Sequence, residues 1–307
     1  MHIPVLAREV LEYLIPETGE CRVIDCTVGY GGHSSLILAK NRKAVLLGID
    51  RDDEAIAAAE EVLKFAAGRF SLSRGNFSDL AELAAGKRWL SADVVLMDLG
   101  VSSPQIDSPR RGFSFKHDGP LDMRMDCHAD RTASRFLNTA GVEDLEFAFR
   151  EYGEIRESRR LARKIVERRN EKAWFGTLEF ADFCNSVLGR QRRPGLQAAT
   201  LCFQALRIAV NSELQELEKA LPKAVELLRP GGRIAVISFH SLEDRIVKRY
   251  FVSEARDCIC PPGLPVCCCG HKKILKIITR RPLEAGRDEV QENRRAGSAK
   301  MRVAEKI

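Results

Sequence analysis

Residues 23–38, VIDCTVGYGGHSSLIL, constrain the fold of this chain more than any other stretch. An apolar run ends at Asp25, a glycine-rich turn follows, and apolar spacing of helical period resumes at Leu36. A strand, a glycine turn and a helix in this order build the ligand-binding corner of many α/β folds. The stretch therefore predicts a parallel sheet with a ligand at the turn.

The rest of the chain continues this alternation, with one interruption. Strands are expected at 22–28, 44–50, 69–77, 92–100, 233–239, 273–280 and 299–307. Helices are expected at 33–40, 52–66, 211–228 and 241–251, with a turn at 229–232. Ser241 and Asp244 are expected to form the capping box of the last of these helices. Apolar strands separated by helices indicate a parallel sheet that is covered on both faces.

The interruption divides the chain into two expected domains. Between residues 109 and 205 the pattern changes to polar loops and helices. We therefore expect a discontinuous α/β domain formed by residues 1–108 and 206–307. The segment 109–205 is expected to be an inserted helical domain that recognises the substrate.

Composition is that of a globular protein. Hydrophobic residues make up 45% of the chain and charged residues 30%, and no apolar run approaches the ~20 residues that a membrane helix needs. The first residues form an amphipathic pattern that charges interrupt, unlike a signal peptide. We expect a cytoplasmic protein with no membrane partner.

The charge distribution favours a polyanionic partner. The net charge is +6, but residues 1–108 are net negative and the remainder is net positive. A helix expected at 154–169 carries many basic side chains around a narrow apolar stripe of Ile155, Leu161 and Ile165. We expect part of this helix to contact nucleic-acid phosphates; the alternative is an ordinary solvated face.

Ten cysteines in a chain without a secretory signal argue against a disulfide framework. Five of them lie in CICPPGLPVCCC, residues 258–269. Two Cys-x-Cys pairs can supply four thiolates to one tetrahedral zinc ion if the Pro-Pro-Gly turn folds the halves together. The candidate ligands are Cys258, Cys260, Cys267 and Cys269. The spacing differs from the usual Cys-x2-Cys, so a loop that collects cysteines without binding metal is the alternative.

The glycine turn alone does not distinguish a dinucleotide from S-adenosylmethionine, because its spacing is not Gly-x-Gly-x-x-Gly. Asp50, which ends the second strand, suits the ribose hydroxyls of either ligand; alternatively it caps the next helix. Two later features favour S-adenosylmethionine. LLRPGGRIAVISF resembles the fifth strand of class I methyltransferases, and antiparallel strands at 273–280 and 299–307 fit the reversed strand of that sheet.

The segment after the fourth strand, DLGVSSPQIDSPRRGFSF, is expected to hold the methyl acceptor. Asp98 stands where amine-directed methyltransferases carry the first residue of an Asp/Asn-Pro-Pro-aromatic motif, which this chain matches only in part. Such a residue orients the amine lone pair toward the methyl group, so Asp98 is the predicted catalytic residue. If Asp98 merely caps the loop, the alternatives are Ser102, Ser103 and His240. Phe113 or Phe115 would stack a splayed base; alternatively both belong to the core.

The chain resembles the RsmH family, also called MraW, in six segments: VIDCTVGYGGHS, DLGVSSPQ, RGFSF, DGPLDMRMD, FQALRIAVNSEL and SFHSLEDRIVKR. The resemblance covers essentially the whole chain, and DGPLDMRMD is its most specific part. It implies S-adenosylmethionine as methyl donor and a class I, Rossmann-like fold with an inserted helical domain. It also implies methylation of N4 of a cytidine in the decoding region, at the P site, of 16S rRNA in the small ribosomal subunit.

The resemblance also implies a donor site. Its residues would be Gly31, Gly32, His33, Asp50, Phe77, Asp98 and Gln105. Phe77 would lie near the adenine, and Asp98 and Gln105 at the methionine end. The chain departs from the family outside this set, at Thr200-Leu201-Cys202 and at Arg294 and Gly297.

Two other functions remain as alternatives. One is a methyltransferase of the same fold with another acceptor, such as a protein or a different RNA. The other is a non-catalytic RNA-binding assembly factor, against which the glycine turn, Asp50 and Asp98 argue.

Overall fold

The computed structural model describes residues 4–189, 197–261 and 266–307. The chain divides into two compact units: Met1–Gly100 with Leu214–Ile307, and Val101–Glu213. We call them the α/β unit and the helical unit.

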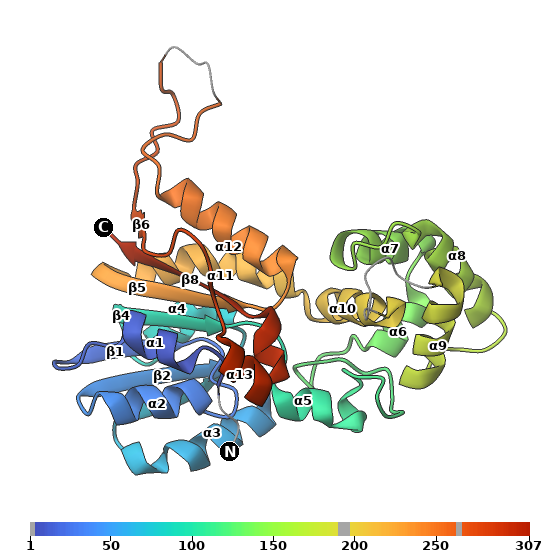
Figure 1. Ribbon diagram of the computed structural model, residues 1–307, viewed down its shortest axis with the longest axis horizontal. Coiled ribbons are helices and arrows are strands. Elements are labelled where there is room, and N and C mark those ends of the chain that lie inside the picture. The colour runs from blue at the N-terminus through green and yellow to red at the C-terminus, as the bar shows by residue number, and fades with distance from the viewer. Residues whose placement is uncertain (1–3, 190–196, 262–265) are drawn as a thin grey trace. The chain divides into compact units, whose positions relative to one another are not determined.

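The α/β unit is built on one sheet (Figure 1). Its strands are β1 (Cys21–Asp25), β2 (Ala44–Asp50), β3 (Phe70–Arg74), β4 (Ala92–Asp98), β5 (Leu228–Ser238), β6 (Leu275–Ile277), β7 (Leu283–Glu284) and β8 (Lys300–Lys306). Their order is β3-β2-β1-β4-β5-β8-β6, and β7 pairs with β8. Strands β1 to β5 pair in parallel, whereas β8 is antiparallel to β5 and β6. This parallel sheet with a reversed strand confirms the α/β fold predicted from the sequence.

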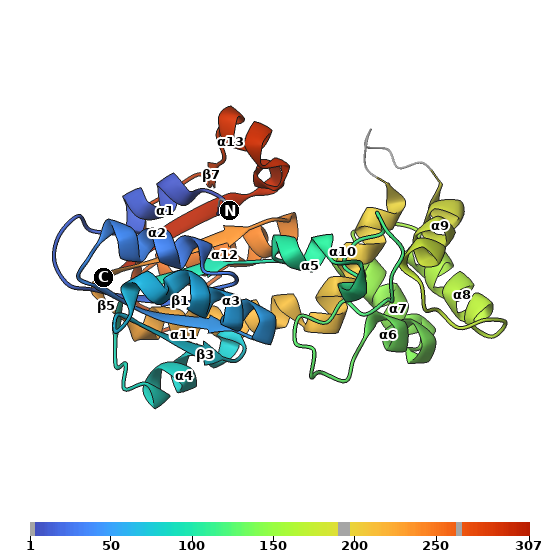
Figure 2. The same cartoon turned by 90° about the horizontal axis from the view of Figure 1, so that it is seen from below.

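Helices cover both faces of the sheet, because its central strands are apolar on both sides. They are α1 (Ala7–Leu14), α2 (Gly32–Lys40), α3 (Asp53–Leu63), α4 (Leu80–Gly86), α11 (Glu213–Leu227), α12 (Ser241–Glu254) and α13 (Arg287–Glu292), with short turns η1 (Lys64–Ala66), η2 (Phe77–Asp79) and η5 (Arg294–Ser298). One buried cluster packs α1 and α2 against the sheet, and another packs α4, α11 and α12. Figure 2 shows α1 and α2 on one side of the sheet and α4 and α11 on the other.

Two local expectations in this unit are wrong. Residues 229–232, expected as a turn, lie inside β5, where the register with β4 shifts between Ala92 and Val94. The capping box of α12 consists of His240 and Glu243, not of Ser241 and Asp244. Glu243 lies three residues after the cap and reaches back to its N–H, whereas Asp244 accepts two hydrogen bonds from the Arg302 guanidinium, at 2.6 and 2.9 Å.

The helical unit contains α5 (Ser103–Asp107), α6 (Ala133–Thr139), α7 (Val142–Phe147), α8 (Ser158–Arg169), α9 (Thr177–Leu188) and α10 (Ala198–Asn211), with η3 (Pro109–Arg111) and a π-helical turn, η4 (Ala148–Tyr152). Helix α10 packs on α9 and η4, and α5 packs on η3. Residues 101–108 and 206–213, which were expected in the α/β domain, belong to the helical unit. Among the described helices, none has the length and apolar character that a bilayer crossing requires.

Helix α8 begins at Ser158, four residues later than the sequence indicated. Glu154 has a φ of 50°, in the left-handed region, and a right-handed helix cannot pass through such a residue. Ile155 nevertheless remains buried beside Leu161 and Ile165, so the expected apolar stripe is present.

Candidate functional site

Three aspartates end the neighbouring strands β1, β2 and β4: Asp25, Asp50 and Asp98. Because β1 pairs in parallel with both β2 and β4, the carboxyl ends of these strands meet at one edge of the sheet. Asp50 and Asp98 were expected at this edge, whereas Asp25 was given no role. The signal that marks all three is the same, an acidic residue that closes an apolar strand.

Asp25 holds the beginning of α2 against β1. Its buried carboxylate accepts a hydrogen bond from the Ser34 hydroxyl at 2.6 Å and one from the Thr27 N–H at 3.2 Å. Burial raises the pKa of Asp25 to about 6, although both hydrogen bonds act in the opposite direction. The charge of this carboxylate is therefore costly, and its partners compensate for only part of that cost.

Asp50 holds the glycine turn. Its carboxylate accepts hydrogen bonds from the Gly29 N–H at 2.9 Å and from the Asp52 N–H at 3.0 Å. Burial raises its pKa. The alternative that Asp50 caps α3 is wrong, because the N-cap is Asp52, whose side chain accepts from the Glu54 N–H.

The turn itself depends on glycine at Gly31, which has a φ of 79° and caps α2. A side chain here would be strained by the left-handed backbone, and its Cβ would lie 3.3 Å from Ala59 Cα. Gly32 then opens α2. The turn therefore brings the backbone of α2 to the edge where the three aspartates end their strands.

His33, the second residue of α2, faces Asp98 across this edge. The His33 Nε2 lies 3.4 Å from Asp98 Oδ2, and the Asp98 N–H donates to the Thr27 hydroxyl at 2.6 Å. Both His33 ring nitrogens and Asp98 Oδ1 are buried and have no hydrogen-bond partner among the described residues. A buried polar atom without a partner costs about 1–3 kcal/mol. Their presence together indicates a place that a bound ligand completes.

The two remaining residues of the implied donor site, Phe77 and Gln105, lie in different units of the structure. Phe77 begins η2, just beyond the end of β3, and packs half-buried against the core cluster of α4 and α11. Gln105 belongs to the helical unit, where its Oε1 accepts from the Ser102 N–H at 3.0 Å in the capping box of α5. The structure thus brings Gly31, Gly32, His33, Asp50 and Asp98 together at one edge of the α/β unit. Ser102, an alternative catalytic residue, is a helix cap, and so is His240.

The two candidate stacking residues are both partly buried within the helical unit. The Phe115 ring packs edge-on against Phe203, with centroids 4.9 Å apart. The Arg111 guanidinium lies 5.9 Å from the centroid of Phe113. The geometry of Phe115 therefore favours the alternative that it packs in the core.

The segment DGPLDMRMD, residues 118–126, is fixed by side chains from elsewhere in the helical unit. The Asn211 side chain accepts from the Met125 N–H at 2.8 Å and donates to the Met123 carbonyl oxygen at 2.7 Å. The Arg111 guanidinium donates to the Met125 carbonyl oxygen at 3.1 Å. These side chains satisfy buried backbone groups of a segment that forms neither helix nor strand.

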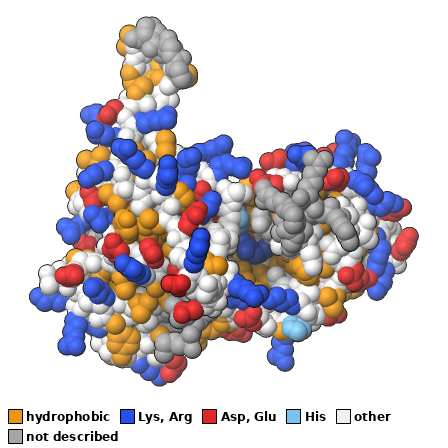
Figure 3. Space-filling model, in the orientation of Figure 1, with side chains coloured by type: hydrophobic (Ala, Val, Ile, Leu, Met, Phe, Trp, Pro, Cys, Tyr) orange, Lys and Arg blue, Asp and Glu red, His pale blue; other side chains and the backbone are white. Residues whose placement is uncertain are grey.

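Helix α8 buries its apolar stripe and exposes basic side chains. Arg160 and Arg163 on the helix, and Arg156 just before it, are exposed, and none of them has an ion-pair partner in the described ranges. Figure 3 shows Lys and Arg side chains, mixed with carboxylates, along the edge of the helical unit where Figure 1 draws α8. These three arginines are therefore available to a polyanion.

Other basic residues of α8 have structural partners. Arg168 forms an ion pair with Glu179, and its guanidinium lies 4.7 Å from the ring centroid of Trp174. Arg159 Nε lies 3.8 Å from a Glu146 carboxylate oxygen. The expected phosphate-binding surface is thus reduced to part of the helix.

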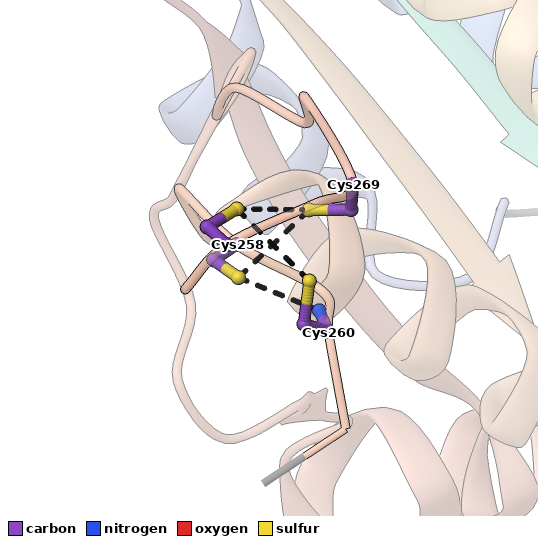
Figure 4. Close-up of side chains that lie close together, drawn as sticks. Cys258, Cys260 and Cys269 are labelled. Atoms are coloured by element: carbon purple, nitrogen blue, oxygen red, sulfur yellow. Dashed lines mark hydrogen bonds between the residues drawn. The ribbon is translucent and has the colours of Figure 1, made fainter. Parts of the chain in front are cut away.

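The cysteine-rich segment leaves the α/β unit between α12 and β6 (Figure 1). We call residues 257–261 and 266–274 the cysteine arms; the turn expected at 261–263 falls partly outside the described residues. The sulfur atoms of four free cysteines lie within 4.8 Å of one another: Cys258, Cys260, Cys267 and Cys269. Figure 4 shows the side chains of Cys258, Cys260 and Cys269 turned toward one another. The arms therefore bring the four predicted ligands together.

Backbone N–H groups surround these sulfurs. Those of Ile259 and His271 lower the pKa of Cys269 to about 6, and that of Cys268 lowers the pKa of Cys260. The N–H of Cys260 acts in the same direction on Cys258, but hydrogen bonds with the other thiols raise its pKa to about 12. Neighbouring thiols that share protons in this way do not all ionise together without a cation.

Comparison with known proteins identifies the family. The model of the MraW methylase family matches residues 1–307. The chain is 46% identical over 306 residues to Ribosomal RNA small subunit methyltransferase H of Carboxydothermus hydrogenoformans, covering 100% of this chain and 98% of that protein. It is 47% identical over 308 residues to the protein of the same name from Trichlorobacter lovleyi, with the same coverage. The resemblance found in the sequence is confirmed: the chain belongs to the MraW methylase family.

Proposed function

We propose that this protein transfers a methyl group from S-adenosylmethionine to N4 of a cytidine at the P site of 16S rRNA, in the small ribosomal subunit. The names of its relatives support a small-subunit rRNA acceptor. The observation that carries the proposal is the pair His33 and Asp98, whose buried polar atoms at the edge of the sheet have no hydrogen-bond partner within the described part of the chain.

The edge of the sheet fits the donor. Gly31 and Gly32 bring backbone close to it, and Asp50 uses one lone pair of each oxygen for the turn, which leaves others for two ribose hydroxyls. Phe77 would lie beside the adenine, and Asp98 and Gln105 would hold the methionine end. When bound, S-adenosylmethionine supplies an electrophilic methyl group on a positively charged sulfur.

Asp98 acts on the acceptor. The lone pair of the cytidine N4 amine is delocalised into the ring, so it attacks carbon only when its orientation is fixed. Asp98 Oδ1, which is buried and has no partner in the described ranges, would accept a hydrogen bond from this amine and so direct its lone pair at the methyl carbon. As the N–C bond forms and the bond from the methyl carbon to the donor sulfur breaks, the amine would become positively charged, and the carboxylate would stabilise that charge until the amine releases a proton to solvent.

The exposed arginines of α8, together with Arg156 just before the helix, would hold rRNA phosphates. Arg156, Arg160 and Arg163 carry no competing ion pair in the described part of the chain, so binding a phosphate breaks no protein contact. These contacts fix the position of the protein on the subunit and carry no sequence information.

Donor binding is tested by calorimetry on the purified protein. We expect S-adenosylhomocysteine to bind and NAD not to bind. Asp50→Ala should weaken the binding of S-adenosylhomocysteine by ~1.5–3 kcal/mol, because a charged hydrogen-bond acceptor is lost. Asp53→Ala, on the exposed surface of α3, removes the same charge nearby and should leave the affinity unchanged. Binding of NAD alone would contradict the donor assignment.

The acceptor is tested by mapping modified nucleotides in ribosomal RNA from cells with and without the gene. We expect one P-site cytidine to lose its N4-methyl group, and the purified protein to restore it on unmodified small subunits. If the lost methyl group lies on a protein or another RNA, the proposed acceptor is wrong. Donor binding without methyl transfer to any acceptor would instead indicate an assembly factor.

A further inference from the structure

The cysteine arms are held at their base but have no core of their own. The His271 Nε2 lies 3.2 Å from the Ser253 carbonyl oxygen, and the Ile274 N–H donates to the Glu254 carbonyl oxygen at 2.9 Å. Both contacts fix the arms to the end of α12. Beyond them, Ile259 and Val266 are 48% and 76% exposed. Hydrophobic burial therefore does not explain why the tips of the arms come together.

Three of the sulfur–sulfur distances are close to those of a tetrahedral zinc site, and all four sulfurs lie within 4.8 Å of one another. A zinc ion with four Zn–S bonds of about 2.3 Å places its sulfurs about 3.8 Å apart. Here the sulfur atoms of Cys260 and Cys267 are 4.0 Å apart, those of Cys267 and Cys269 are 3.5 Å apart, and those of Cys258 and Cys269 are 3.8 Å apart. A disulfide bond requires a sulfur–sulfur distance of about 2.05 Å, and these cysteines are free.

The backbone around the sulfurs supports thiolate ligands. The Cys260 N–H lies 3.4 Å from the Cys258 sulfur. Such hydrogen bonds orient metal-bound thiolates and disperse their charge. His271 itself is anchored to α12, so the ligand set consists of sulfur alone.

We propose that Cys258, Cys260, Cys267 and Cys269 bind one structural zinc ion that joins the two cysteine arms. A closed set of four thiolates leaves no open position, so the ion orders the arms and has no part in methyl transfer. Cys268 lies between two ligands, and its sulfur is 3.8 Å from that of Cys260, but it is not among the four mutually close cysteines. The proposal does not depend on the proposed function, because the arms contain no donor-site residue.

Metal analysis of the full-length protein, purified under reducing conditions without chelators, tests the site. We expect one zinc ion per chain in the wild type. The double variant Cys258→Ser/Cys269→Ser should contain almost none, whereas Cys268→Ser, which removes an exposed thiol from the same segment, should keep the full amount. Substitution with cobalt should give the absorption of tetrahedral thiolate coordination in the wild type and in Cys268→Ser.

Three results would overturn the proposal. One is a wild-type protein that contains no zinc even after anaerobic incubation with zinc chloride. Another is iron in place of zinc, and the third is a loss of metal as large in Cys268→Ser as in the double variant. Binding of S-adenosylhomocysteine by each variant shows that the α/β unit is folded, so metal loss cannot be attributed to general unfolding.

Discussion

The α/β unit and the helical unit both contain polar motifs, but the polar atoms of these motifs differ in whether they have hydrogen-bond partners. At the edge of the sheet, His33 is buried and Asp98 half-buried, and both have buried polar atoms with no hydrogen-bond partner among the described residues. In the helical unit, Asn211 and Arg111 satisfy the backbone of DGPLDMRMD, and Arg207 forms a bidentate pair with Glu213 at 2.8 and 2.9 Å. A motif that leaves polar atoms unpaired is prepared for a ligand, whereas one that pairs them holds the fold.

The largest expected effect is that of Asp98→Asn on turnover. This change keeps the shape but removes the charge, and we expect a loss of ~10²-fold or more, as when one preorganised electrostatic group is removed. Stability should change little, because Asp98 Oδ1 has no partner in the described structure to lose. The measurement is single-turnover methyl transfer to unmodified small subunits at saturating donor.

Asp93→Asn provides the matched control for this prediction. Asp93 lies at the opposite end of β4, where it pairs with Arg229, so its change should leave turnover at the wild-type value. If Asp98→Asn has a near wild-type rate, or loses stability in place of rate, the unpaired atoms of the α/β unit do not serve catalysis, and the comparison between the two units fails.

Asn211→Ala should have the opposite signature. It leaves the Met125 N–H and the Met123 carbonyl oxygen buried without their partner, which should lower the stability of the helical unit by about 1–3 kcal/mol. The affinity for S-adenosylhomocysteine should be unchanged. Hydrogen exchange of residues 118–126, together with thermal unfolding, measures the effect.

The control for Asn211→Ala is Asn170→Ala, at the exposed end of α8, which should change stability by less than about 0.5 kcal/mol. If Asn211→Ala unfolds no more readily than this control, the hydrogen bonds to DGPLDMRMD do not stabilise the unit.

The smallest expected effect is that of charge reversal on α8. Arg160→Glu/Arg163→Glu should weaken binding to the small subunit and lower the slope of log affinity against log salt by about 1.5, because two phosphate contacts are lost. Arg42→Glu/Lys43→Glu, before β2 on the α/β unit, makes the same change in net charge at exposed positions. If the two double variants have equal slopes of log affinity against log salt, Arg160 and Arg163 belong to an ordinary solvated surface and do not bind phosphate.

Much of the fold follows from local sequence signals. The predictions that were wrong concern single residues whose conformation or hydrogen bonds depend on their neighbours in the structure. Apolar runs and glycine turns predicted the strands, because burial on two faces demands a continuous apolar sequence. The predicted start of α8 was wrong because Glu154 has a left-handed backbone conformation. The residue before it, Gly153, lies so close to the Phe149 carbonyl oxygen that a Cβ at this position would be 2.8 Å away. The role of Asp50 as a helix cap was wrong because Asp52 is better placed for it.

The sequence by itself determined the order of strands and helices, the family, and which polar residues stand at strand ends, because period, turn chemistry and motifs are written along the chain. The tertiary structure decided which of those polar atoms have partners. Asp98 meets His33 only because β1 and β4 are neighbours, and Asn211 reaches Met125 across 86 residues of sequence. Whether a polar group is paired depends on such distant contacts, and no local pattern records them.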